Sequence, residues 1–135
     1  MSKFSQDFLN YCNYINNNGS DEDYTDNCKK YRSQFIAALS FAEPKELASL
    51  AKDYQFIIHM EDGFELYKRY FELGGREKEV LNDFLEFLWF WGDFDDVIPA
   101  LTEIIESENN NSLEDIIKVI IRGGLAGLDK LIETQ

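Results

Sequence analysis

The sequence offers few side chains suited to general acid–base or nucleophilic catalysis. His59 is the only histidine, and it lies among the apolar residues Ile57, Ile58 and Met60. A Ser–His–carboxylate or Cys–His arrangement would have to use this histidine, and no nucleophile elbow accompanies it. The two Gly-Gly pairs are isolated and do not form a phosphate-binding loop. We therefore interpret His59 as a packed residue and expect that the protein is not an enzyme.

The 26 acidic residues raise the question of metal and glycosidase chemistry. A di-iron bundle needs Glu-x-x-His from two helices, which a single histidine cannot supply. Neither 21–23 nor 93–97 has the order of oxygen ligands that a calcium-binding loop requires. Two carboxylates could flank a glycosidic bond, but the spacing singles out no pair. The sequence predicts neither a metal ion nor a cofactor.

The acidic residues are concentrated in one stretch. Between Lys78 and Lys118 there is no Lys, Arg or His, and this stretch contributes −11 to a formal net charge of −13. Its eleven acids are Glu79, Asp83, Glu86, Asp93, Asp95, Asp96, Glu103, Glu106, Glu108, Glu114 and Asp115. Within it, residues 84–91 read Phe-Leu-Glu-Phe-Leu-Trp-Phe-Trp, so seven of eight positions are large and apolar. A large apolar cluster among charges of one sign is typical of a surface that binds a basic partner.

The overall composition indicates a folded protein that binds neither nucleic acid nor membrane. With 135 residues, 44% hydrophobic and 15% aromatic content, the chain is long and apolar enough to bury a core, and we expect a single domain over 1–135. Its negative charge repels phosphate groups. The N-terminal residues lack the apolar core of a signal peptide, and no apolar run could span a bilayer. These features predict a cytoplasmic protein.

Helical periodicity dominates the pattern of apolar residues. The expected helices cover 3–16, 20–42, 44–59, 64–73, 76–91, 97–107, 112–121 and 125–132. The fold class predicted is therefore all-α, a compact domain of about seven helices arranged as a bundle or as an array of helical hairpins. Two segments, 55–60 and 116–121, also suit buried strands. We expect breaks at 61–63 and at the Gly-Gly pairs 74–75 and 123–124.

The first two expected helices should form an antiparallel hairpin. Cys12 and Cys28 lie symmetrically about its turn, so a disulfide between them is geometrically feasible. Two small buried thiols that pack as apolar groups are favoured over a disulfide in a cytoplasmic protein.

The helices 76–91 and 97–107, joined by a short loop, should carry the binding surface. On the first helix, Glu79, Asp83, Glu86 and Phe90 fall opposite the apolar face. The predicted acidic contacts are Glu79, Asp83, Glu86, Asp93, Asp95, Asp96, Glu103 and Glu106. Phe87 and Trp89 exceed what one inward stripe requires, so either the far end of this helix is buried on nearly all sides or part of it is exposed for a partner. In the second case the predicted aromatic anchors are Trp89, Phe90 and Phe94, because aromatic residues supply most of the energy at such interfaces. Asp95 and Asp96 also have a structural use as caps at the start of the second helix.

A small, acidic, all-α chain with this stretch and no catalytic set resembles the immunity proteins of bacterial toxin systems, of the contact-dependent growth inhibition and colicin nuclease types. The resemblance lies in size, charge and residues 79–117, and no family motif transfers functional residues. It implies tight binding to a cognate basic toxin domain, usually a nuclease, which the protein would neutralise.

Three alternatives fit the same residues. An inhibitor that mimics DNA would expose many acids and few aromatic side chains, so burial of Trp89 and Phe94 would favour it. A helical adaptor or subunit would use 84–94 to bind a protein without inhibiting it, and its binding would survive high salt. Exposed aromatic residues would serve a homodimer equally well.

Overall fold

The computed structural model describes residues 2–18, 26–92, 94–107 and 110–133. Within these ranges the chain forms seven α-helices and one short 3-10 helix and contains no strand, which confirms the predicted all-α class. The internal contacts divide the chain into two units, Met1–Arg69 and Tyr70–Gln135, with the boundary inside one helix. The expectation of one domain over 1–135 stays a prediction.

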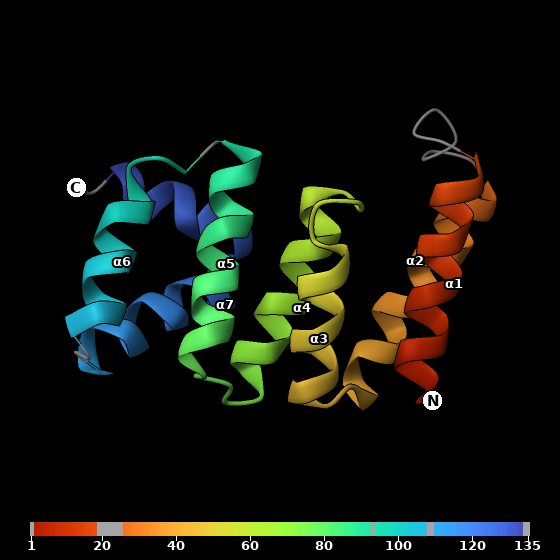
Figure 1. Ribbon diagram of the computed structural model, residues 1–135, viewed down its shortest axis with the longest axis horizontal. Coiled ribbons are helices and arrows are strands. Elements are labelled where there is room, and N and C mark those ends of the chain that lie inside the picture. The colour runs from red at the N-terminus through yellow and green to blue at the C-terminus, as the bar shows by residue number, and fades with distance from the viewer. Residues whose placement is uncertain (1, 19–25, 93, 108–109, 134–135) are drawn as a thin grey trace. The chain divides into compact units, whose positions relative to one another are not determined.

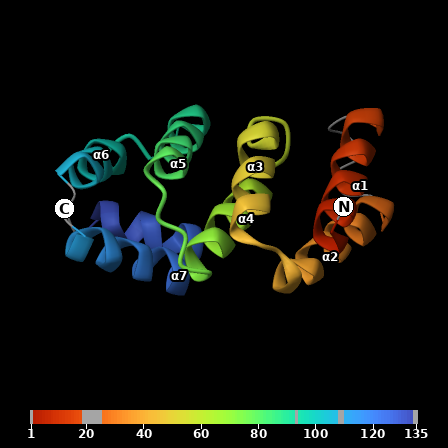
Figure 2. The ribbon, with the colours of Figure 1, turned by 60° about the horizontal axis from the view of Figure 1, so that its bottom comes forward.

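The first unit contains α1 (Lys3–Asn18), α2 (Asp26–Ala38), η2 (Leu39–Phe41), α3 (Pro44–Tyr54) and most of α4 (Met60–Glu72). Figures 1 and 2 both show α1 and α2 side by side, which confirms the predicted hairpin. Phe8 of α1 packs edge-to-face on Phe35 of α2 and on Tyr54 of α3, with ring centroids 5.4 and 5.6 Å apart. Aromatic residues at the predicted inward positions thus join three helices in one core.

Both cysteines are buried in this core without a disulfide between them, as favoured from the sequence. Burial, with a smaller contribution from the nearby charge of Asp62, raises the pKa of the Cys12 thiol to about 12. Cys12 is therefore a protonated, unreactive thiol at neutral pH and packs as an apolar group.

The predicted break at 61–63 was wrong. Helix α4 starts at Met60 and runs through Gly63, because the amides of Asp62 and Gly63 both donate to the carbonyl of His59, at 3.0 Å each. The break lies at 55–59 instead, so α3 ends at Tyr54 rather than at 59, and the alternative strand at 55–60 does not form.

The turn between α3 and α4 is fixed by a buried amide. Gln55 is 2% exposed, and its Oε1 accepts a hydrogen bond of 2.5 Å from the hydroxyl of Tyr67. Since this contact pulls residue 55 inward, the following Phe56 and Ile57 are left partly exposed.

A second buried polar contact in this unit joins three helices. The carboxylate of Asp62, which has no exposed surface, accepts a hydrogen bond from the Tyr11 hydroxyl, and its Oδ1 lies 2.7 Å from Nε of Arg32. Burial raises the pKa of Asp62, while Tyr11 and Arg32 oppose that shift. Burial, together with the adjacent carboxylate, also raises the pKa of Tyr11.

We expect a specific pH dependence from Asp62. Because its pKa is raised in the folded state, folded Asp62 takes up its proton before unfolded Asp62 does as the pH falls from neutrality. The wild-type protein should therefore gain stability relative to Asp62→Asn on going from about pH 7 to about pH 5. Urea unfolding of both proteins at the two pH values measures this difference, and a relative loss for the wild type would contradict the assignment.

The second unit contains the end of α4, then α5 (Lys78–Trp91), α6 (Val97–Ser107) and α7 (Asn110–Glu133). Helix α4 ends at Glu72 and is followed by Gly74 with φ of 91°, as the first Gly-Gly pair predicted. Helix α6 packs against both α5 and α7, and both views show α5 and α6 side by side (Figures 1 and 2). Because a short loop joins them, these two helices run antiparallel.

The segment 116–121 is helical, not a strand, and the second Gly-Gly pair breaks α7 as predicted. Gly124 has φ of 58° and ψ of −140°, a conformation open in practice to glycine alone. The two parts of α7 therefore meet at a sharp kink, and Gly127 beyond it lies against the backbone of Val119 before it.

Gly127 should not tolerate a side chain. A Cβ at this position would lie 2.5 Å from the carbonyl oxygen of Val119. We expect Gly127→Ala to lower the free energy of unfolding by about 1–3 kcal/mol, because the backbone must shift. Gly123→Ala in the same helix is the control, since its Cβ would meet nothing within 4 Å. A neutral Gly127→Ala would contradict the close approach of the two parts.

Candidate functional site

Helix α5 has the two faces that the sequence predicted. Its buried side chains are Val80, Leu81, Phe84, Leu85, Phe87 and Leu88. On the other side, Glu79, Glu86 and Phe90 are exposed and Asp83 is half-buried. The inward position of Phe87 explains part of the aromatic excess in 84–91 as core packing. Trp89 and Phe90 account for the remainder, because both reach solvent.

The last turn of α5 presents these two aromatic side chains. Trp89 is 71% exposed, the largest exposed fraction among the large apolar residues described, and Phe90 is 49% exposed. Phe90 packs perpendicular to Trp91, with ring centroids 5.2 Å apart. The indole nitrogen of Trp91 is buried and finds no acceptor among the described residues. Exposure on this scale leaves most of Trp89 accessible to a partner.

Helix α5 ends at Trp91 and is capped by Gly92, which has φ of 77° and donates its amide to the carbonyl of Leu88 at 3.2 Å. This left-handed residue turns the chain toward α6. The last turn of α5 contains no basic residue. The partial negative charge at the carboxyl end of the helix is therefore not offset by a cation from its own last turn.

The prediction of Phe94 as a partner-binding anchor was wrong. Phe94 is 2% exposed, and its carbonyl accepts the amides of Val97 at 3.0 Å and Ile98 at 3.1 Å. Phe94 thus packs inward and starts α6. The following Asp95 and Asp96 lie in an exposed turn just before α6, at the same end of the helix pair as Trp89 in the last turn of α5. Asp93 lies outside the described residues.

The predicted acids of α6 lie at the other end of this helix. Glu103 and Glu106 are exposed, while Val97, Leu101 and Ile105 face inward. Because α5 and α6 are antiparallel, the end of α6 lies near the start of α5, where Glu79 is located. From Glu79 to Trp89 the rise along α5 is about 15 Å. Those of the predicted residues that are exposed therefore form two groups, with Glu86, Trp89, Phe90, Asp95 and Asp96 at one end and Glu79, Glu103 and Glu106 at the other.

Most of these carboxylates form no ion pair with the cations that the structure describes. Within the part of the chain that the structure describes, no ion pair or hydrogen bond involves the side chains of Glu86, Asp95, Asp96, Glu103 or Glu106. The unit that contains them has fifteen acidic and five basic residues, a net charge of −10. The exposed negative charge is thus available to an external cation.

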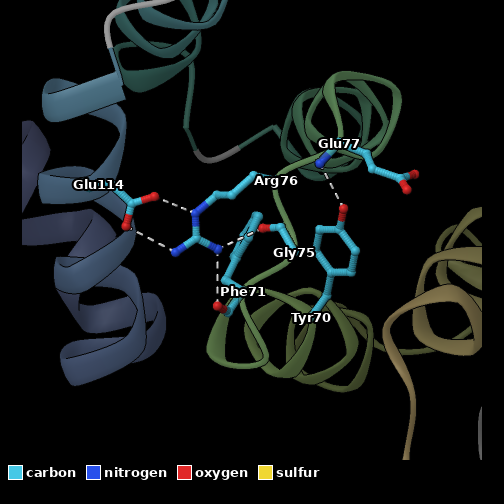
Figure 3. A network of polar contacts seen from close by, with 6 residues as sticks. All are labelled: Tyr70, Phe71, Gly75, Arg76, Glu77 and Glu114. Carbon is cyan, nitrogen blue, oxygen red and sulfur yellow. Dashed lines mark hydrogen bonds and ion pairs between the residues drawn. The ribbon is translucent and has the colours of Figure 1, made fainter.

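Glu114, one of the acids of the 79–117 stretch, stabilises the fold through an ion pair. Glu114 of α7 binds Arg76 through both carboxylate oxygens, at 2.6 Å to Nε and 3.1 Å to Nη2 (Figure 3). The hydrogen bonds from Arg76 lower the pKa of Glu114. Nη1 of Arg76 also donates to the carbonyls of Phe71 and Gly75, at 3.0 and 2.6 Å. This arginine fastens the loop before α5 to α7 and so fixes the start of α5.

A second contact supports the same loop. The amide of Glu77 donates to the hydroxyl of Tyr70 at 2.9 Å, and the Tyr70 ring covers the position where a side chain on Gly75 would lie (Figure 3). Sequence reasoning identified Gly75 only as a helix stop and did not find the Arg76–Glu114 pair. The sequence held one signal for this pair. Because 79–117 contains no basic residue, its acids must pair with cations outside it, and Arg76 is one of the two cations just before the stretch.

In the described ranges, no three His, Cys, Asp or Glu side chains gather in a way that could hold a metal ion. No helix there has the length and apolar character needed to cross a membrane. Comparison with protein-family models, curated proteins and solved structures gave no match. The geometry alone therefore defines the class: an all-α protein that presents exposed aromatic residues between unpaired carboxylates.

Proposed function

We propose that this protein binds a basic protein through the exposed face of α5 and α6 and inhibits it. The observation that carries the proposal is the combination at one end of the helix pair. Trp89 is 71% exposed there, at the same end of the helix pair as carboxylates at 86, 95 and 96 that form no ion pair among the described residues. An aromatic anchor supplies binding energy, and unpaired charge supplies partner choice and a fast association rate.

The class of partner that suits this surface best is a basic toxin domain, as in the immunity proteins that the sequence resembles. Such a domain binds nucleic acid through a cationic surface, which an acidic protein can cover. The second group of acids, Glu79, Glu103 and Glu106, extends the negative surface along the helix pair. A folded partner requires a contact surface larger than a single side chain can cover, and the two groups together provide such a surface.

The alternatives are less well supported. A DNA-mimicking inhibitor predicts few exposed aromatic residues; buried Phe94 agrees with it, but exposed Trp89 and Phe90 do not. A second copy of this chain is a poor occupant, because it would bring the same unpaired carboxylates against this face. An adaptor without inhibitory activity differs from the proposal only in the consequence of binding, which an activity assay distinguishes.

The test is capture followed by inhibition. Tagged wild-type protein and the tagged variant Asp95→Lys/Asp96→Lys serve as baits in parallel capture experiments at low salt. A basic protein that only the wild type captures is then purified and assayed for nuclease activity. We expect wild-type protein to abolish this activity at an equimolar ratio and the variant to leave it unchanged. Equal capture by both proteins would show that the acidic turn only caps α6, and binding without inhibition would favour the adaptor.

A further inference from the structure

The carboxyl end of α5 combines three features that favour the same kind of side chain. The Trp89 ring is exposed, the negative end of the helix dipole has no basic residue in its last turn, and two unpaired aspartates follow in the next turn. Each of these attracts a cation: the indole face through its π electrons, the helix end through its carbonyl groups and the aspartates through their charge.

The position of the two aspartates is set by the core. Phe94 is buried, and its carbonyl holds the first two amides of α6. Asp95 and Asp96 therefore lie in a turn anchored on both sides, rather than in a long loop. Only four residues separate Trp91 from Asp96, so the acidic turn stays next to the last turn of α5. Trp89, in that last turn, and the two aspartates therefore lie at the same end of the α5–α6 pair.

We propose, building on the proposed function, that the end of α5 is a recognition site for an arginine side chain of the basic partner. The planar guanidinium stacks on an indole face better than an ammonium does, and it loses its hydration more easily. Its fork of N–H donors also pairs with a carboxylate through two parallel hydrogen bonds. Lysine can satisfy the charge at this site, but not the stacking and the paired hydrogen bonds together.

The experiment compares two labelled probes, a six-residue arginine peptide and a six-residue lysine peptide, by fluorescence anisotropy at low salt. We expect the arginine peptide to bind wild-type protein about fivefold more tightly. Trp89→Ala should reduce this preference to within about twofold. Asp95→Asn/Asp96→Asn should weaken the binding of both peptides.

The control variant is Phe41→Ala, which removes another exposed aromatic side chain, 68% exposed and in the first unit. It should leave the preference unchanged. Equal affinity for the two peptides, or a preference that survives Trp89→Ala, would overturn the arginine site while leaving the binding of a basic partner intact. Binding of neither peptide would also overturn it, whereas the proposed function is judged separately by the capture and inhibition assay.

Discussion

Phe94→Ala is expected to lower the free energy of unfolding by about 3–5 kcal/mol, whereas Trp89→Ala should change it by less than about 0.5 kcal/mol. The two aromatic residues lie five positions apart in the same acidic stretch, but Phe94 is 2% exposed and Trp89 is 71% exposed. Removal of the buried ring leaves a cavity and loosens the start of α6. Removal of the exposed ring costs little packing.

Urea unfolding followed by circular dichroism measures both changes. Comparison of the two variants separates effects on stability from effects on binding, because Trp89→Ala should weaken partner binding about thirtyfold with little effect on stability. Strong destabilisation by Trp89→Ala would contradict the exposed position of this ring. A stable Phe94→Ala variant would contradict the anchoring of the turn 95–96.

Neutralisation of the acidic turn should weaken the complex with the purified basic partner about tenfold at low salt. The variant Asp95→Asn/Asp96→Asn removes two charges with little change in shape. At about 0.5 M salt the wild type and the variant should bind with similar affinity, because exposed charges are then screened. Titration calorimetry at both salt concentrations provides the measurement.

The control for this prediction is Asp26→Asn/Asp53→Asn, which makes the same change in net charge at exposed positions of the first unit. It should bind almost as tightly as the wild type. An equal loss of affinity in the control would mean that net charge alone, and not the α5–α6 surface, attracts the partner. A loss that persists unchanged at high salt would indicate that Asp95 and Asp96 act through structure.

The helices and the faces of α5 were predictable because they depend on local periodicity. Buried and exposed positions of α5 follow the 3.6-residue repeat, and Gly74, Gly92 and Gly124 adopt the positive φ that glycine favours. The exposure of Glu86 and Phe90 follows from the same pattern. For these elements the amino-acid types alone carry enough information to predict where the helices lie and which side of α5 is buried.

The features that sequence reasoning missed depend on contacts between distant residues. The inward turn at Gln55 depends on the hydroxyl of Tyr67, twelve positions later, so the acidic 61–63 segment starts a helix instead of ending one. The pairing of Arg76 with Glu114 spans 38 positions. Periodicity carries no information about which of many acids a given arginine will choose.

Phe94 illustrates another limit of prediction from the sequence. An aromatic residue between aspartates has the composition of an interface anchor, yet in this chain it packs into the core where α6 begins. Composition therefore identified the acidic-aromatic stretch but not which aromatic residues face solvent. Trp89 and Phe90, on the regular part of α5, reach solvent, whereas Phe94, in the irregular turn, is buried.

The most direct test of the central claim is the accessibility of Trp89 in the complex. In a Trp91→Phe background Trp89 is the only tryptophan, and its fluorescence reports on one position of the proposed surface. The substitution also removes an indole nitrogen that has no acceptor among the described residues. Acrylamide quenching is measured with and without the purified basic partner. We predict efficient quenching of the free protein and strong protection in the complex; unchanged quenching under conditions where the complex forms would show that the partner binds elsewhere.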